Sequence, residues 1–213
     1  SAGGGGIGME VCRGVNALKG AWNSVKRMGA NYFSDDTVFL EKFIVNARHI
    51  EVQIFGDGRG NAIALGERDC SAQRRNQKVI EECPAPNLSQ DLREAMHRTA
   101  ETLMASVQYR NAGTVEFIFD IDAQSFYFLE VNTRLQVEHG VTEEVYDVDL
   151  VEWMLKLAAN EMEPLDLIRQ NLAPSGHAIQ VRLYAEDAAQ DFQPSAGLLS
   201  DVFFPTADYL RVD

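Results

Sequence analysis

The sequence has few cysteines and no long hydrophobic segment, and each shortage excludes a class of protein. Its 213 residues include only three cysteines, Cys12, Cys70 and Cys83, which are widely spaced and form no CxxC pair. A disulfide framework or a zinc site needs paired or clustered ligands, so we expect free thiols in a reducing, cytoplasmic compartment. No apolar run approaches the roughly 18 residues of a membrane span, and no signal-peptide pattern is visible.

Basic residues are also scarce. Lys and Arg number 19 against 32 Asp and Glu, which gives a formal net charge of −13. A general nucleic-acid binder needs a basic face, so we expect neither nucleic acid nor a membrane as a partner. An anionic substrate would need a locally basic pocket. The remaining composition, 46% hydrophobic and 24% charged, is that of an ordinary globular protein with a buried core.

Hairpins interleaved with helices predict an α+β fold with largely antiparallel sheets. Strand-like segments cover residues 9–12, 37–45, 49–55, 62–65, 113–120, 126–132 and 178–184. Helical periodicity begins near Val15, with Asn16 as a candidate N-cap, resumes after the candidate cap Ser89, and covers residues 149–159. Pro164 and Pro174 flank a segment that we expect to be a linker.

Five glycines crowd the start of the chain: Gly3, Gly4, Gly5, Gly6 and Gly8. Without a Cβ, such residues can turn several backbone N–H groups toward one anion, which suits a phosphate. The run matches neither the P-loop pattern nor the dinucleotide-binding fingerprint. Taken alone, a glycine run is more often a mobile loop or a linker, and that alternative stays open.

The most basic stretch of this acidic chain runs from Arg68 to Lys78, with four cations against one carboxylate. A charge run is usually a solvated loop. This one directly follows a predicted strand, where polar functional loops commonly lie. Both interpretations therefore remain open.

Two glutamates of the second hairpin are predicted to face one another. If the turn centres on Ala123, Glu116 lies opposite Glu130, where like charges destabilise a sheet. Their neighbours are apolar, and a lone buried carboxylate would be costly. A hard divalent cation would remove the conflict, and Asn132 offers a third oxygen from the same face. The pattern favours Mg²⁺ with a nucleotide, although the carboxylates could instead lie on the solvent face.

A short polar segment follows this predicted metal site. Arg134 could hold an oxyanion through two hydrogen bonds, and Glu138 could act as a general base in suitable surroundings. Alternatively, the two form a surface ion pair of little consequence. We interpret His139 as structural.

These motifs, in this order, resemble the biotin carboxylase branch of the ATP-grasp superfamily. The matching strings are GGGGIGM at 3–9, EKFI at 41–44, RHIEVQ at 48–53, GERDCSAQRRNQK at 66–78, EFIF at 116–119, FLEVNTRLQVEH at 128–139 and GHAIQVRLYAED at 176–187. Several independent motifs spread over nearly the whole chain make the resemblance specific, whereas any one of them alone would be weak.

The resemblance implies an ATP-grasp fold and a role for each matching residue. The nucleotide site would contain the glycine loop (Gly3, Gly4, Gly5, Gly6, Gly8) with Glu41, Lys42, His49 and Gln73. Glu116, Glu130 and Asn132 would hold one or two Mg²⁺ or Mn²⁺ ions. Lys78, Arg134 and the backbone at Gln136 and Val137 would bind bicarbonate. Glu138 would deprotonate the bicarbonate, and Arg182 would line the biotin site.

The implied reaction is ATP-dependent carboxylation of biotin by bicarbonate through carboxyphosphate, the work of a carbon–nitrogen ligase. Within the branch, Ile7, Asn76, RLYAED and FQPSAGLLSDVFFP at 192–205 resemble urea carboxylase, the front half of urea amidolyase. The biotin carboxylase part of an acyl-CoA or pyruvate carboxylase is the alternative. A non-catalytic nucleotide-binding scaffold and an ATP-grasp ligase for another carboxylate are further alternatives.

The resemblance also predicts how the chain is organised. Residues 1–43 would be the remainder of a mobile lid subdomain, and residues 44–213 would be the ATP-grasp core with the start of a C-terminal region. The expected partners are bicarbonate and the biotin carrier and carboxyltransferase domains of the same parent protein, which could be dimeric. Since the family's N-terminal subdomain finds no match, we expect a fragment that turns over poorly by itself.

Overall fold

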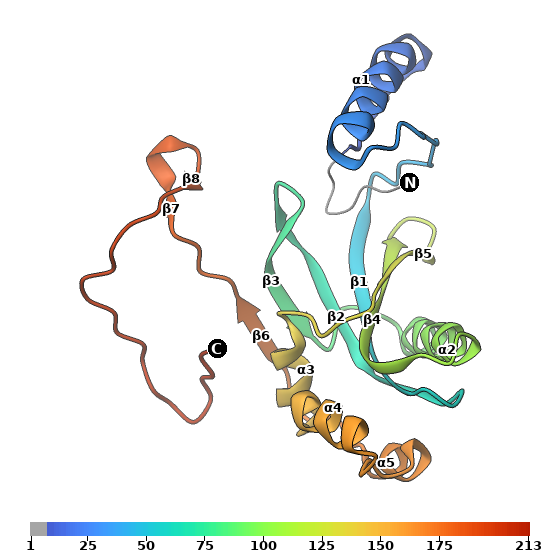
Figure 1. The fold of residues 1–213 in the computed structure, drawn as a ribbon, viewed down its shortest axis with the longest axis vertical. Helices are drawn as coiled ribbons and strands as arrows, with labels where there is room; N and C mark the ends of the chain where they lie inside the picture. The colour runs from blue at the N-terminus through green and yellow to red at the C-terminus, as the bar shows by residue number, and fades with distance from the viewer. Residues whose placement is uncertain (1–7) are drawn as a thin grey trace. The chain divides into compact units, whose positions relative to one another are not determined.

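The computed structural model describes residues 8–213 and has the predicted α+β character (Figure 1). It divides into a first unit that ends at Val181 and a second unit, Arg182–Asp213, and each is described by itself. The elements of the first unit are α1 (Val15–Phe33), β1 (Ala47–Asp57), β2 (Ala62–Arg74), β3 (Gln77–Cys83), α2 (Gln90–Ser106), β4 (Arg110–Asp120), β5 (Ser125–Asn132), α3 (His139–Tyr146), α4 (Leu150–Ala159), α5 (Leu165–Asn171) and β6 (Ala178–Val181). The second unit holds β7 (Glu186–Asp187), a 3₁₀ turn (Ala188–Gln190) and β8 (Gln193–Pro194).

Six strands form one antiparallel sheet in the order β5-β4-β1-β2-β3-β6. Successive side chains of a strand point to opposite faces, and β1 uses this alternation to separate two environments. Ile50, Val52 and Ile54 join the apolar core that α2 covers with Met96, Ala100 and Met104. Glu51 and Gln53 therefore point to the opposite face, where they are also fully buried.

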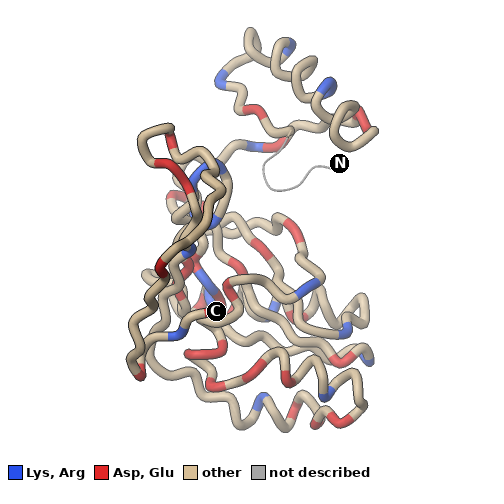
Figure 2. Tube along the Cα trace, turned by 60° about the vertical axis from the view of Figure 1, so that its left-hand side comes forward, with Lys and Arg blue, Asp and Glu red and all other residues tan. Residues whose placement is uncertain are grey.

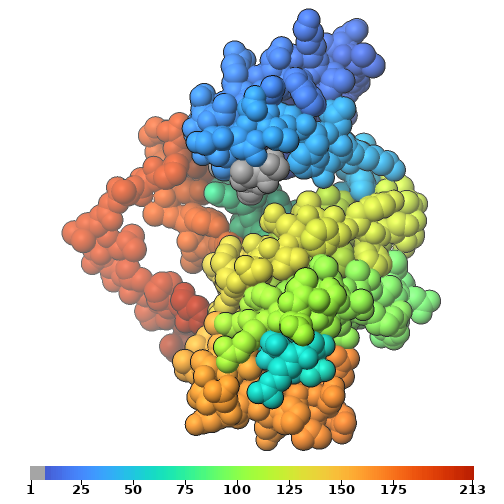
Figure 3. Space-filling view, turned by 45° about the vertical axis from the view of Figure 1, so that its right-hand side comes forward, coloured from blue at the N-terminus to red at the C-terminus, as the bar shows by residue number. Residues whose placement is uncertain are grey.

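That opposite face is apolar at one end of the sheet only. Phe55, Ile63 and Leu65 pack there with Leu150 and Leu157 of α4 and with Leu165 of α5. In the space-filling view, the β1–β2 turn (cyan) lies at the surface beside these helices (orange) (Figure 3). The apolar contacts fix α4 and α5 against the sheet and leave the other end of the same face to charged side chains.

Both predicted hairpins and all three predicted helices are confirmed. Ser89 caps α2 by accepting a hydrogen bond from the backbone N–H of Leu92 (3.3 Å), and Asp149 caps α4 through the N–H of Glu152 (2.7 Å). The N-cap of α1 is Gly14 and not Asn16, which lies inside the first turn. The three cysteines are free, as expected. No helix in the described part of the chain is long and apolar enough to span a membrane.

Two expected strands are absent from the described residues, because composition alone supplies no partner. Residues 9–12 and 37–45 have no regular structure and belong to no sheet. Met9 and Val11 are exposed, so their apolar side chains pack against no second layer. The strand expected over 178–184 ends at Val181, where its pairing with β3 stops.

The linker expected between Pro164 and Pro174 contains a helix, α5. Pro164 is its N-cap residue, and Asp166 lies in the first turn, where a carboxylate favours the positive end of the helix dipole. Leu165 and Ile168 pack into the core beside α4. Tertiary burial therefore stabilises a helix that is too short to form alone.

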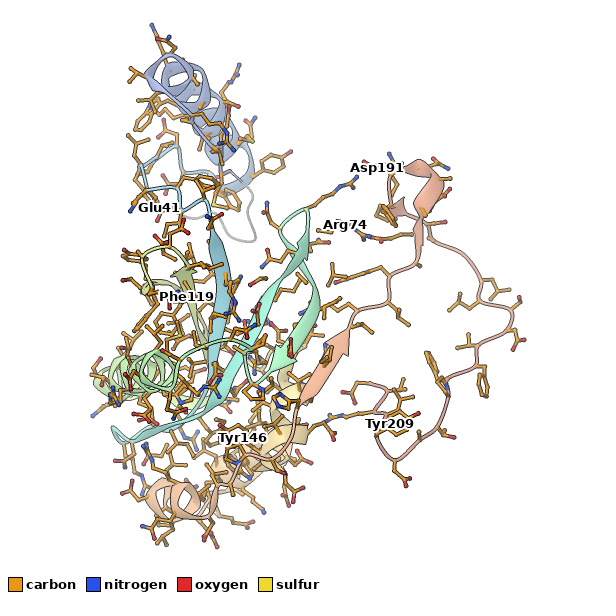
Figure 4. All side chains as sticks on the ribbon, turned by 180° about the vertical axis from the view of Figure 1, so that it is seen from behind. Glu41, Arg74, Phe119, Tyr146, Asp191 and Tyr209 are labelled. Atoms are coloured by element: carbon orange, nitrogen blue, oxygen red, sulfur yellow. The ribbon has the colours of Figure 1, made fainter. Side chains whose placement is uncertain are left out.

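The basic stretch Arg68–Lys78 is part of the sheet and not a solvated loop. Strand β2 continues to Arg74, β3 begins at Gln77, and only Arg75 and Asn76 form the turn. Both have positive φ, 51° and 61°, as a two-residue hairpin turn that matches the strand twist requires. Figure 4 marks Arg74 at the tip of this hairpin.

Candidate functional site

A row of charged residues crosses four strands on the sheet face opposite α2. Glu130 on β5 pairs with Glu116 on β4, Glu116 pairs with Glu51 on β1, and Glu51 pairs with Arg68 on β2. Glu116, Glu51 and Arg68 are buried, whereas Glu130 is exposed. Basic and acidic positions thus lie close together within a chain in which acidic residues outnumber basic ones (Figure 2).

The predicted pairing of Glu116 with Glu130 is confirmed, although it arises differently. The hairpin turn places Asp120 opposite Ser125. The turn is therefore centred between Asp122 and Ala123 and not on Ala123, as the prediction assumed. An irregularity after Glu116 shifts the register by one residue and restores the expected pair. A β-bulge of this kind re-aims side chains beside functional sites.

Lys78 is the centre of the site. Its ammonium group reaches from β3 and donates hydrogen bonds to Glu51 Oε2, to Glu116 Oε1 (2.9 Å) and to Glu138 Oε1 (2.7 Å). Burial alone would lower the pKa of Lys78, but the carboxylate of Glu51 and those around it raise it above its usual value. Lys78 therefore stays charged, and it joins strands β1, β3 and β4 to Glu138, the N-cap residue of α3.

Arg68 forms a second, fully buried centre next to Lys78. Its guanidinium donates to Glu51 Oε1 (2.6 Å), Gln53 Oε1 (2.7 Å), Thr142 Oγ1 (2.9 Å) and Thr114 Oγ1 (3.2 Å). Burial disfavours the charged form, but Glu51 outweighs it and keeps the pKa of Arg68 raised. These hydrogen bonds connect strands β1, β2 and β4 to α3, and Glu138 is the N-cap residue of that helix.

The carboxylate of Glu116 is held by several donors. His49 Nε2 lies 3.0 Å from Oε2, while Lys78 Nζ and Asn132 Nδ2 each lie 2.9 Å from Oε1. Gln73 Nε2 lies 2.9 Å from His49 Nδ1, so the imidazole of His49 lies between the Gln73 amide and the Glu116 carboxylate. Burial raises the pKa of Glu116, but His49 and Lys78 outweigh burial and lower it to about 2.

This arrangement predicts an acid-sensitive fold. A carboxylate whose pKa is lowered by folding stabilises the native state above its unfolded pKa, 4.5 for Glu116, and that stability is lost as the pH falls toward 2. For Glu116 the loss is on the order of 3 kcal/mol. Glu116→Gln should reduce the loss of unfolding free energy between pH 5 and pH 2.5, measured by urea titration. The exposed Glu163→Gln should leave it unchanged, and an unaltered acid response in Glu116→Gln would contradict the assigned contacts.

The donor set at Glu116 suits a hard divalent cation. The carboxylates of Glu116 and Glu130 face each other across the hairpin, and the amide of Asn132 lies within hydrogen-bonding distance of Glu116. Oxygen donors of this kind are those that Mg²⁺ and Mn²⁺ prefer. In the present arrangement the repulsion between Glu116 and Glu130 is reduced by Lys78 and His49, which lie beside the Glu116 carboxylate. A cation that binds Glu116 would have to replace one of these side chains.

The segment after β5 brings some of the predicted anion-binding residues together. Arg134 is exposed and donates to the backbone oxygen of Leu135 (3.3 Å) and to Gln136 Oε1 (3.0 Å). Gln136 is buried, and Val137 is exposed. Glu138 is only 1% exposed and bonds Lys78, so a surface ion pair between Arg134 and Glu138 was the wrong alternative.

Other predicted site residues lie elsewhere along the chain. Gly3, Gly4, Gly5 and Gly6 lie outside the described residues, whereas Gly8 has a positive φ of 83°. Glu41 and Lys42 are exposed in the segment without regular structure before β1, where Figure 4 marks Glu41. Arg182 begins the second unit, so it is described apart from the rest of the site.

The sequence interpretation missed Glu51 and gave Arg68 no role, although both lie at the centre of the site. A signal for Glu51 exists in the string RHIEVQ, where charged or polar residues alternate with Ile50 and Val52. In a central strand such alternation marks one apolar face and one face that needs polar partners. Arg68, on the neighbouring strand, is the partner of Glu51.

Comparison with known proteins connects this geometry to one group of enzymes. The model of the carbamoyl-phosphate synthase L chain ATP-binding domain matches residues 1–166. The chain is 54% identical over 213 residues to urea amidolyase of Lachancea kluyveri, covering 100% of this chain and 11% of that protein. It is 51% identical over 200 residues to the propionyl-CoA carboxylase alpha chain of Ruegeria pomeroyi, covering 94% and 29%.

A solved structure shows the same fold. The biotin carboxylase–β,γ-ATP complex from Campylobacter jejuni superimposes with a TM-score of 0.90 at 44% identity and covers 97% of this chain and 45% of that one. The chain therefore spans about a tenth of the length of the urea amidolyase and less than half of the biotin carboxylase.

Proposed function

The chain belongs to the family of the carbamoyl-phosphate synthase L chain ATP-binding domain, and from that membership we propose that it carboxylates biotin with bicarbonate at the expense of ATP, as the biotin carboxylase part of a urea carboxylase. Its fold is the ATP-grasp fold of the biotin carboxylases, as the sequence predicted. The match to the urea amidolyase along the whole chain supports the urea carboxylase assignment.

The cluster around Lys78 is the observation that carries the proposal. One ammonium group lies between Glu116, a candidate metal ligand, and Glu138, a candidate base, at 2.9 Å and 2.7 Å. The transfer of a phosphoryl group to bicarbonate needs a cation for the anion, a base for its proton and a metal site for the nucleotide. Neighbouring side chains offer a candidate for each requirement, with Lys78 and Glu116 on the sheet and Glu138 at the start of α3.

Each residue has a role in this proposal. Lys78 and Arg134 hold bicarbonate together with the backbone at Gln136 and Val137, and Glu138 accepts its proton. The bicarbonate oxygen attacks the γ-phosphorus and ADP leaves. The resulting carboxyphosphate then transfers its carboxyl group to a biotin nitrogen, and inorganic phosphate leaves with the N–H proton. Mg²⁺ on Glu116, Glu130 and Asn132 would neutralise charge on the transferred phosphoryl group. The nucleotide side would comprise Gly3, Gly4, Gly5, Gly6, Gly8, Glu41, Lys42, His49 and Gln73, and Arg182 would serve the biotin side.

Two alternative functions remain. One is the same reaction within a different parent enzyme, and the other is nucleotide binding without catalysis. The 51% identity to a propionyl-CoA carboxylase alpha chain supports the biotin carboxylase part of an acyl-CoA carboxylase as a second candidate. A scaffold without catalysis would have no use for a buried base paired with a buried ammonium, whose desolvation is costly. Intact Lys78 and Glu138 therefore favour an enzyme.

The organisation of the parent protein is part of the same proposal. Residues 1–43 would belong to a lid and residues 44–213 to the core, with the biotin carrier and carboxyltransferase domains supplied by the parent, which could form a dimer. The free cysteines fit a reducing compartment such as the cytoplasm.

Calorimetric titration with ATP, with and without Mg²⁺, tests the nucleotide site. We expect binding that depends on Mg²⁺ and that Glu130→Ala weakens about tenfold, equivalent to 1.4 kcal/mol. Because Glu130 is exposed, the substitution should leave the melting temperature almost unchanged. The exposed Glu163→Ala serves as the matched control. If Glu130→Ala bound Mg²⁺ and ATP as the unmodified chain does, Glu130 would not be a ligand; if the folded chain bound no ATP, the nucleotide site would be refuted.

A further inference from the structure

We propose that Lys78 couples the two ligands of the site: a divalent cation that takes Glu116 releases an N–H donor of Lys78, and this donor then binds bicarbonate. The inference rests on the proposed function and adds a dependence between two binding events. Because coupling free energies are reciprocal, each ligand would tighten the binding of the other.

The donors of Lys78 are all in use. An ammonium group has three N–H donors and no acceptor. In the structure it contacts three carboxylates, those of Glu51, Glu116 and Glu138. All three donors are therefore used by the protein, and an anion can be bound by Lys78 only if one of these carboxylates is exchanged.

Glu51 is the carboxylate least able to leave. It is fully buried, and its second oxygen accepts a hydrogen bond from Arg68 Nε at 2.6 Å. Moving Glu51 away from Lys78 would break a network that has no access to water. Glu51 therefore keeps its hydrogen bond with Lys78 while the ammonium group changes its other partners.

Glu116 is the carboxylate that can be exchanged at least cost. Besides Lys78 it has His49 at Oε2 (3.0 Å) and Asn132 at Oε1 (2.9 Å), and it faces Glu130 across the hairpin. A divalent cation placed between Glu116 and Glu130 would carry twice the charge of the ammonium. It would replace Lys78 at Oε1 and repel it toward Glu51 and Glu138. One donor then points away from Glu116, next to the base Glu138.

Nuclear magnetic resonance on the 213-residue chain tests this coupling directly. The dissociation constant of Mg²⁺ is taken from amide shifts of β4 and β5 at a fixed ionic strength, with either bicarbonate or chloride as the anion. We expect bicarbonate to tighten Mg²⁺ binding at least about fivefold. In Lys78→Met the two constants should be equal, and in the surface variant Lys156→Met the unmodified ratio should persist.

The ammonium resonance of Lys78 gives a second measurement that needs no variant. Mg²⁺ alone should shift this resonance, since the lysine changes one of its three partners. An unshifted resonance at saturating Mg²⁺, equal Mg²⁺ affinity in bicarbonate and chloride, or tightening that persists in a folded Lys78→Met chain would each overturn the coupling and leave the proposed function intact. Absence of any Mg²⁺ binding would refute the metal site of the proposed function together with the coupling.

Discussion

Replacing Arg68 with methionine should lower the free energy of unfolding by about 3–5 kcal/mol, because it removes one partner from a buried ion pair. Arg68 is fully buried and donates to Glu51, Gln53, Thr114 and Thr142. Methionine fills similar space but leaves these four acceptors without their donor, and an unsatisfied buried polar group costs its desolvation. The loss would spread across three strands and α3.

Urea unfolding measures this effect, and two further variants separate its causes. Arg68→Lys keeps the charge but loses the planar fork of donors, so we expect an intermediate loss. Arg98→Met removes an exposed arginine that pairs with Glu94 on α2, and such surface pairs contribute no more than about 1 kcal/mol. If Arg68→Met were no less stable than Arg98→Met, the buried network would not support the fold.

Replacing Glu138 with glutamine should slow biotin carboxylation by about 100- to 10,000-fold, the range for loss of a general base. Glutamine has the same shape and keeps an acceptor for Lys78, so ATP affinity should stay nearly unchanged. The assay uses a chimera in which this chain replaces the matching segment of the Campylobacter jejuni biotin carboxylase, which supplies the parts of the enzyme that these residues do not span. Carboxylation of free biotin is then measured at saturating ATP.

A matched control separates loss of the base from general damage. Glu161→Gln in the same chimera changes an exposed glutamate just after α4 and should retain full activity. Carboxylation by Glu138→Gln at the rate of the unmodified chimera would remove Glu138 from the role of base. A parallel loss of ATP binding would instead indicate that Glu138 shapes the nucleotide site.

Local rules predicted the parts of the fold that neighbouring residues decide. Alternation and turn residues give both hairpins, and Ser89 is recognisable as a helix cap because its hydroxyl satisfies an N–H within its own turn. The pairing of Glu116 with Glu130 followed from the same reasoning, although a β-bulge and not the assumed turn produces it. The sequence did not predict ion pairs, strands or helices that depend on contacts between distant residues, because local patterns do not show which strands and helices pack together.

Glu51 and Arg68 illustrate this limit. They are 17 residues apart, and their contact at 2.6 Å exists only because β1 and β2 pair in a particular register. The strand expected over 37–45 is the opposite case, since its residues favour a strand but no strand within residues 8–213 pairs with them. The helix α5 forms because Leu165 and Ile168 are buried by other elements, and periodicity over seven residues is too short to show it.

The central claim, that these residues carboxylate biotin, is tested most directly by incorporation of labelled bicarbonate into free biotin by the unmodified chimera, with the Campylobacter jejuni enzyme as positive control. We predict labelled carboxybiotin that requires ATP and Mg²⁺ together and that forms with release of ADP. A folded chimera that binds ATP and Mg²⁺ but leaves biotin unlabelled would contradict the account.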